Sequence, residues 1–161
     1  TEAIVGKAKA IRTDYQPTED DNVTIKGVAG DTYAMGFLGY AYYEENKDKV
    51  KAVAIDHGKG CVLPSRETVL DGTYQPLSRP LFIYVNVKSL DRPEVQAFVD
   101  FYLSPAARRA IRSTGYVELP SEAYRIGQEL VKRRKAGTFF MELPAGTPLS
   151  KFIQELDKEL R

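Results

Sequence analysis

The chain has 161 residues, of which 43% are hydrophobic and 28% are charged, a balance typical of one folded globular domain. Its 23 basic and 22 acidic side chains leave a net charge of +1, which indicates no general attraction to nucleic acid or to an anionic membrane. The single Cys61 excludes a disulfide-stapled mini-domain, and the single His57 leaves little room for a zinc site or a catalytic triad.

The first part of the chain is predicted to mix helices with buried strands. Residues 2–10 have helical periodicity without an entry loop, so we expect the chain to begin partway through an element. Residues 23–28 fit a short helix or a strand. Residues 36–43, rich in glycine and aromatic side chains, predict a buried strand, and residues 50–55 predict a strand buried on much of both faces.

A short capped helix and the strongest strand come next. Residues 64–67 (Pro-Ser-Arg-Glu) indicate the start of a helix that ends at Gly72, and residues 81–87 (Leu-Phe-Ile-Tyr-Val-Asn-Val) indicate a strand. The longest apolar stretch, residues 34–43, is too short to span a membrane and contains two glycines. If the protein is exported, we expect its targeting segment to lie outside this chain.

The last 70 residues predict four amphipathic helices. Their expected starts are Asp91, Ser104-Pro105, Ser121 and Thr147-Pro148, and Gly115 and Gly137 are expected to stop the second and third. The first and last helices carry the clearest apolar stripes: Val95, Phe98, Val99, Tyr102 and Leu103 in one, and Leu149, Phe152, Ile153, Leu156 and Leu160 in the other. Since so many stripes need a sheet to pack on, we expect further strands to lie elsewhere.

Several clusters could carry chemistry, but a structural role explains each of them better. The aromatic cluster of Phe37, Tyr40, Tyr42 and Tyr43 could stack on bases or sugars, and core packing is the favoured interpretation. The basic runs at 108–112 and 132–135 fall late in predicted helices, where cations complement the helix dipole.

Metal and nucleophile sites are not supported by the residue pattern. The acidic run at 19–22 lacks the alternating ligand spacing of a calcium loop. Cys61 lies near His57 in sequence without an evident orienting group, so we expect Cys61 to serve in packing. The pattern predicts no metal site and no cofactor.

Ser78-Arg79-Pro80 is the most informative short motif. A hydroxyl and a guanidinium just before a strand could meet an oxyanion, since arginine offers two parallel donors. The alternative is a hinge-crossing segment whose arginine pairs with a carboxylate, and the residues alone leave both interpretations open.

Longer motifs resemble a known family over essentially the whole chain. They are residues 12–15 with 19–23, residues 27–31 running into 36–43, residues 71–85 (Asp-Gly-Thr-Tyr-Gln-Pro-Leu-Ser-Arg-Pro-Leu-Phe-Ile-Tyr-Val), and residues 115–120. Together they resemble the second half of the substrate-binding protein of the bacterial phosphate ABC transporter, a type II periplasmic binding protein. The run at 71–85 is the most specific.

The resemblance implies an α/β fold with one lobe and the C-terminal helices of the other. It implies a second-lobe portion at residues 1–80, and a crossover strand with returning helices at residues 81–161. It further implies a non-enzymatic, periplasmic or extracytoplasmic clamp for inorganic phosphate that delivers its ligand to an ABC permease and binds no nucleic acid. The partner of this chain would be the missing N-terminal half or a second copy.

In that family, hydroxyls, helix-start N–H groups, an arginine and an acidic residue hold the anion, and most of these ligands would lie upstream of Thr1. Ser78 and Arg79 match the family motif and are the candidate ligand-binding residues here. One rival is a stand-alone interaction or scaffold domain without a ligand of its own. The other is an anion-handling hydrolase, for which the sequence offers no nucleophile with its base.

Overall fold

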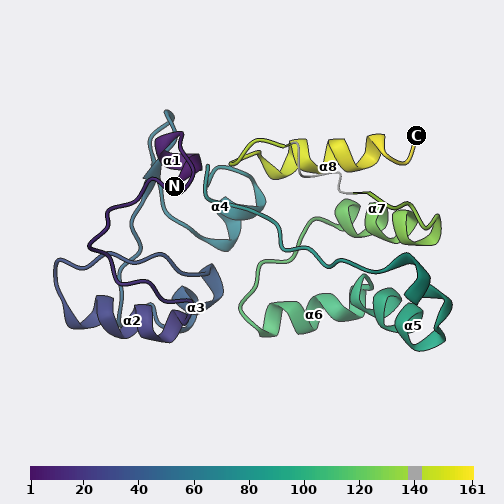
Figure 1. Cartoon of the computed structure of the whole chain (residues 1–161), viewed down its shortest axis with the longest axis horizontal. Helices are drawn as coiled ribbons and strands as arrows, with labels where there is room; N and C mark the ends of the chain where they lie inside the picture. Colours follow the sequence, from purple (N-terminus) through teal and green to yellow (C-terminus); the bar gives the residue numbers. More distant parts are fainter. Residues whose placement is uncertain (138–142) are drawn as a thin grey trace.

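The computed structural model describes residues 1–137 and 143–161, and most of its regular structure is helical (Figure 1). The elements in chain order are α1 (Glu2–Val5), α2 (Asp21–Gly30), α3 (Tyr40–Glu45), β1 (Ile55–Asp56), β2 (Cys61–Val62), α4 (Arg66–Leu70), the 3-10 helix η1 (Val87–Asp91), α5 (Pro93–Tyr102), α6 (Pro105–Ser113), α7 (Ser121–Lys132) and α8 (Leu149–Lys158). Within the described ranges the only sheet is the antiparallel pair β1–β2. This mixture of helices with a small sheet is compatible with the α/β class.

The elements gather toward two ends of an elongated molecule (Figure 1). Helices α1 to α4 lie at one end and α5 to α8 at the other, and an extended run after α4 crosses from the first to the second. Helices α5 and α6 contact each other, as do α7 and α8. Both α7 and α8 begin on the side of α4 and run away from it, so they lie roughly parallel.

Side-chain caps fix two of the predicted helices. At α4 the N–H of Thr68 donates to Ser65 Oγ at 3.1 Å, and the N–H of Ser65 donates to Thr68 Oγ1 at 2.9 Å. At α6 the N–H of Ala107 donates to Ser104 Oγ at 3.4 Å, and Pro105 is the first helical residue. These helices were predicted from the same residues, and both are confirmed.

Three helix starts or ends differ from the prediction. The helix expected over residues 2–10 stops at Val5, because Gly6 adopts a left-handed conformation with φ of 70°. The segment predicted as helix or strand is the helix α2. Asp20 caps its N-terminus, because the Asp20 side chain accepts a hydrogen bond from the N–H of Asn22 at 2.8 Å. Helix α7 has Pro120 at its N-cap, so the predicted cap Ser121 is its first residue.

Helices α5 and α7 differ from the prediction at three further points. Asp91 was predicted to cap α5, but it ends η1, and Arg92 takes the N-cap position without a capping hydrogen bond from its side chain. Of the predicted α5 stripe, Val99 is buried and Phe98 is exposed. Helix α7 ends at Lys132, ahead of the Gly137 that was expected to stop it.

The predicted strands are mostly wrong. Residues 36–39 belong to no helix or strand and residues 40–45 are helical, so the strand expected over 36–43 is absent. Of residues 50–55 only Ile55 joins a strand. Residues 81–86 are extended without a ladder, and η1 begins at Val87. Each segment has the apolar pattern of a strand, but the described part of the chain places no strand beside it, and a lone extended segment cannot form a sheet.

The main hydrophobic core lies between α7 and α8. Its buried side chains are Ala123 and Ile126 of α7 with Phe152, Ile153 and Leu156 of α8, and the predicted α8 stripe is confirmed. The ring of Phe82 lies 5.2 Å from that of Phe152, so the crossing segment is attached to this core.

A turn near α6 connects the two ends of the molecule. Gly115 has a φ of 77°, and a Cβ built on it would lie 3.3 Å from the Cβ of Ala41 in α3.

Among the described residues no helix combines the length and the apolar character needed to cross a bilayer.

We expect Ile126→Ala to lower the free energy of unfolding by about 3 kcal/mol, because Ile126 is 0% exposed and its truncation leaves a cavity between α7 and α8. Urea denaturation followed by circular dichroism measures the change. Val53→Ala is the matched control, since Val53 is exposed. Equal effects of the two substitutions would contradict this placement of the core.

Candidate functional site

The segment that leads to Ser78 and Arg79 begins at a well-fixed turn. Asp71 Oδ1 accepts from the hydroxyl of Thr73 at 2.6 Å and from its N–H at 2.8 Å, and these bonds hold the pKa of the Asp71 carboxyl below its usual value. The N–H of Tyr74 donates to the carbonyl of Thr68 at 2.9 Å. The end of α4 therefore sets the direction in which the chain leaves.

Gln75 and Pro76 anchor the segment to the loop before α8. A Cβ built on Gly146 would lie only 2.7 Å from Pro76 Cβ, so this approach requires glycine, whose φ is 79°. Gln75 is 7% exposed, and neither its amide oxygen nor its amide nitrogen has a hydrogen-bond partner among the described residues. Burying an amide without hydrogen-bond partners costs free energy of folding. The hydrogen bonding of Gln75 is therefore incomplete within the described residues.

Ser78 and Arg79 follow directly on this anchored turn. Ser78 is half-buried and Arg79 is exposed, and neither side chain makes a hydrogen bond or an ion pair with the described residues. The alternative in which Arg79 pairs with a carboxylate therefore has no counterpart in the part of the chain that the structure describes. The two predicted ligand-binding residues lie beside each other at the start of the crossing run.

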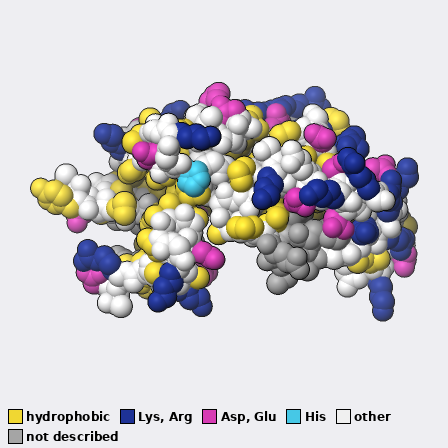
Figure 2. Space-filling view, turned by 90° about the horizontal axis from the view of Figure 1, so that it is seen from above, with side chains coloured by type: hydrophobic (Ala, Val, Ile, Leu, Met, Phe, Trp, Pro, Cys, Tyr) yellow, Lys and Arg dark blue, Asp and Glu magenta, His cyan; other side chains and the backbone are white. Residues whose placement is uncertain are grey.

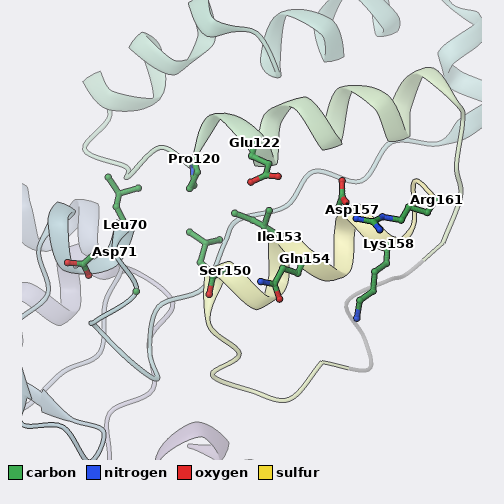
Figure 3. A pocket seen from close by; sticks show the side chains of 12 residues that line it. Leu70, Asp71, Pro120, Glu122, Ser150, Ile153, Gln154, Asp157, Lys158 and Arg161 are labelled. Carbon is green, nitrogen blue, oxygen red and sulfur yellow. Dashed lines mark hydrogen bonds and ion pairs between the residues drawn. The ribbon is translucent and has the colours of Figure 1, made fainter.

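A separate groove lies between the end of α4 and the helices α7 and α8 (Figure 3). Its volume is about 560 Å³. Its lining residues are Leu70, Asp71, Gly72, Pro120, Glu122, Leu149, Ser150, Ile153, Gln154, Asp157, Lys158 and Arg161. Neither Ser78 nor Arg79 lines it.

The charges of this groove disfavour an anion. Three carboxylates line it, from Asp71, Glu122 and Asp157, and its two cations already have acidic partners. Arg161 donates to Asp157 Oδ2 at 3.2 Å, and Lys158 donates to a glutamate of its own helix at 2.7 Å. Arg125 also lies 3.9 Å from the Glu122 carboxylate and 3.6 Å from that of Asp157. Because the cations at this groove are engaged by carboxylates, the groove is a weaker candidate for an oxyanion than the Ser78–Arg79 segment.

An arginine cluster centred on Glu118 connects α4 to α6. Arg66 of α4 donates to Glu118 Oε1 at 2.9 Å, and Arg112 of α6 donates to Glu118 Oε2. The Glu118 carboxylate thus holds two guanidinium groups from different ends of the molecule. We call Arg66, Arg112 and Glu118 the Glu118 cluster, or the brace, because it links α4 to α6. The carboxylate partly compensates the charge of the two arginines.

Arg108 belongs to the same region but has other partners. Its Nη1 donates to Ser121 Oγ at 2.8 Å, and its guanidinium carbon lies 4.4 Å from the ring centroid of Tyr124. The sequence analysis interpreted this basic run as helix-end charge and missed these contacts. Only the short spacing of Arg112 and Glu118 could have indicated the brace, and nothing local indicates Arg66.

The aromatic cluster is only partly buried. Tyr40 and Tyr43 of α3 are half-buried, whereas Phe37 and Tyr42 are exposed, so the core-packing interpretation is wrong for those two residues. The hydroxyl of Tyr40 donates to Glu44 Oε1 at 2.8 Å, and its ring lies 6.2 Å from that of Tyr43. Burial and, next, this hydrogen bond raise the pKa of Tyr40 to about 12. The paired hydroxyl favours a structural role for Tyr40.

The remaining candidate residues, Cys61 and His57, lie in the hairpin formed by β1 and β2. Cys61 in β2 is exposed, so its expected packing role is wrong, and His57 is exposed in the loop between β1 and β2. Within residues 1–137 and 143–161 no three histidine, cysteine or acidic side chains are grouped to hold a metal ion.

Known proteins match the chain in sequence. Protein SphX of Synechocystis sp. is 48% identical over 157 residues, which cover 94% of this chain and 46% of SphX. SphX of Synechococcus elongatus is 44% identical over 140 residues, covering 86% of this chain and 41% of that protein. The phosphate-binding protein PstS of Staphylococcus haemolyticus is 41% identical over 108 residues, covering 66% of this chain and 34% of PstS. No protein-family model matches the chain. No solved structure matches it.

These matches confirm the resemblance to phosphate-binding proteins that the motifs indicated. The chain is a homologue of a part of SphX and of PstS. It spans about half the length of the curated SphX relatives that it matches.

We expect Glu118→Gln to lower the free energy of unfolding by about 1 kcal/mol, because both arginines lose their shared charged partner. Thermal denaturation measures the loss. Glu94→Gln is the control, since Glu94 forms an exposed pair with its neighbour Arg92. If the two variants are equally stable, Glu118 does not brace the molecule.

We expect Tyr40 to make stability fall at alkaline pH. The folded state raises the pKa of this phenol, so its stabilising contribution is complete below the ordinary value of 10.0 and is lost as the pH rises toward about 12. Melting temperatures between pH 9 and pH 12 should therefore decline less for Tyr40→Phe than for the unaltered protein. Tyr33→Phe, at an exposed position, should follow the unaltered protein, and a parallel decline of all three would contradict the assignment.

Proposed function

We propose that this chain supplies one half of a non-enzymatic clamp that binds inorganic phosphate for an ABC transport system. The observation that carries the proposal is sequence homology over 94% of the chain to SphX, together with 41% identity to a PstS protein whose name states phosphate binding. The site of action would be periplasmic or extracytoplasmic. The clamp would pass phosphate to an ABC permease.

The clamp would follow the type II periplasmic-binding-protein plan. Residues 1–80 would belong to the second lobe, and residues 81–161 would supply the crossover strand and the helices that return to the first lobe. The two-ended arrangement of helices with one extended crossing run supports this division (Figure 1). Ser78 and Arg79 lie where that run begins, and a ligand clamped between two lobes lies near such a crossing.

The chemistry of these two residues suits a phosphate oxyanion. The Arg79 guanidinium can direct two parallel N–H donors at two phosphate oxygens, and the Ser78 hydroxyl can donate to one oxygen or accept from a protonated one. Both side chains are without a partner among the described residues, so binding an anion would not require breaking an existing bond. Two side chains are too few to enclose phosphate.

The remaining ligands would come from the missing N-terminal half or from a second copy of this chain. Backbone N–H groups at helix starts are suitable donors for such ligands. The chain by itself should therefore bind phosphate weakly or not at all. The alternative is a stand-alone scaffold domain derived from a binding protein, without its own ligand.

The test uses a full-length protein in which these 161 residues are joined to the part of Synechocystis SphX that they do not match. Isothermal titration with inorganic phosphate should show that Arg79→Gln raises Kd at least about tenfold, since a charge-assisted hydrogen bond is lost. Ser78→Ala should weaken binding less. Arg92→Gln is the control, because Arg92 is exposed and pairs with the adjacent Glu94.

An unchanged Kd in Arg79→Gln would remove Arg79 from the site. A joined protein that folds but does not bind phosphate would contradict the proposed function. Co-purification of a second polypeptide without phosphate would favour the scaffold alternative.

A further inference from the structure

The segment of residues 33–38, between α2 and α3, starts in the turn at residues 32–33, continues outside any helix or strand, and has one open apolar face. Tyr33, Met35 and Phe37 are 95%, 75% and 71% exposed, while the alternate residues 34, 36 and 38 are half-buried. This strict period of two is the pattern of a β-strand. We call the three exposed side chains the Tyr33 face.

The opposite face of the segment is packed on α2. A Cβ built on Gly36 would lie 2.6 Å from Thr24 Cγ2 and 2.9 Å from Val28 Cγ2, so only glycine permits this approach. The segment is therefore held on its helix by one side. Because the other side of the segment packs on α2, the Tyr33 face points outward.

The backbone of the segment is also open. The N–H groups of residues 35–38 donate to no acceptor among the described residues, whereas the N–H of Ala34 closes a turn on Asp31 at 3.1 Å. A strand fixed on a helix but lacking a neighbour leaves donors and acceptors available for a second strand. In Figure 2 hydrophobic side chains protrude at the end of the molecule that holds α2 and α3.

We propose that residues 34–38 form a β-strand that pairs with a strand from the remaining half of the longer protein. That half also covers the Tyr33 face. The inference rests on the proposed function, because it takes its partner from that half. The matched relatives are about twice as long as this chain, so a polypeptide of sufficient length exists for the role.

A second copy of the chain fits this face less well. Three large side chains bury about 450 to 750 Å² on each copy, or about 900 to 1,500 Å² in total, which only just reaches the roughly 1,200 Å² of a stable interface. A neighbouring strand with its own covering layer buries the face and also satisfies the backbone. The observations therefore favour the remaining half as the occupant.

The experiment mixes the purified chain with the part of Synechocystis SphX that it does not match, produced as a separate polypeptide. Sedimentation velocity should show a one-to-one complex, and hydrogen exchange at residues 35–37 should slow at least about a hundredfold in it, because those amides gain strand partners. Met35→Lys should weaken the association at least about tenfold, since it places a charge in an apolar contact. Phe98→Lys is the matched control, on an exposed apolar residue of α5.

Failure to form the complex, a complex without protection at residues 35–37, or equal effects of the two lysine variants would each overturn the inference. So would a self-associated chain that protects these residues, because it would make a second copy the occupant. Phosphate titration of the same complex separates the two proposals. Protection without phosphate binding would contradict the proposed function alone, and phosphate binding without protection would contradict this inference alone.

Discussion

A helix satisfies its own backbone hydrogen bonds, whereas an extended segment depends on a neighbouring strand, and this difference determines which parts of the chain hold together. The described helices bury their apolar sides against each other where they can, as α7 and α8 do around Ile126. Residues 34–38 and 81–86 have strand-like sequences, but in the described part of the chain they belong to no ladder. Their open faces account for much of the exposed apolar surface and for our view that more polypeptide belongs beside them.

Two contacts join the two ends of the molecule, and a third attaches the crossing run to the core of α7 and α8. The Glu118 carboxylate holds arginines of α4 and α6, the turn at Gly115 packs on Ala41, and the ring of Phe82 packs on Phe152. Ser78 and Arg79 lie on the run that these contacts hold between the ends. The clamp that we propose would need firm parts joined by a defined crossing, and these three contacts would provide that relation.

Local signals predicted the helices well, and non-local partners explain most errors. The Ser65 box, the Ser104-Pro105 start and the apolar stripe of α8 depend on residues within a few positions of one another, and all three are confirmed. The strands were mispredicted because pairing depends on segments far apart in sequence. For the site, the motif predicted Ser78 and Arg79, and their ligand role stays a prediction. The Glu118 brace and the unpartnered Gln75 could not be predicted, because their geometry arises only in the folded chain.

The central claim is that this chain is one half of a phosphate clamp. Equilibrium dialysis with radiolabelled phosphate tests it most directly, applied to the chain alone, to the unmatched part of Synechocystis SphX alone, and to the two together. The account predicts retention of phosphate by the mixture and negligible retention by either piece. Tight retention by the 161-residue chain alone would contradict it.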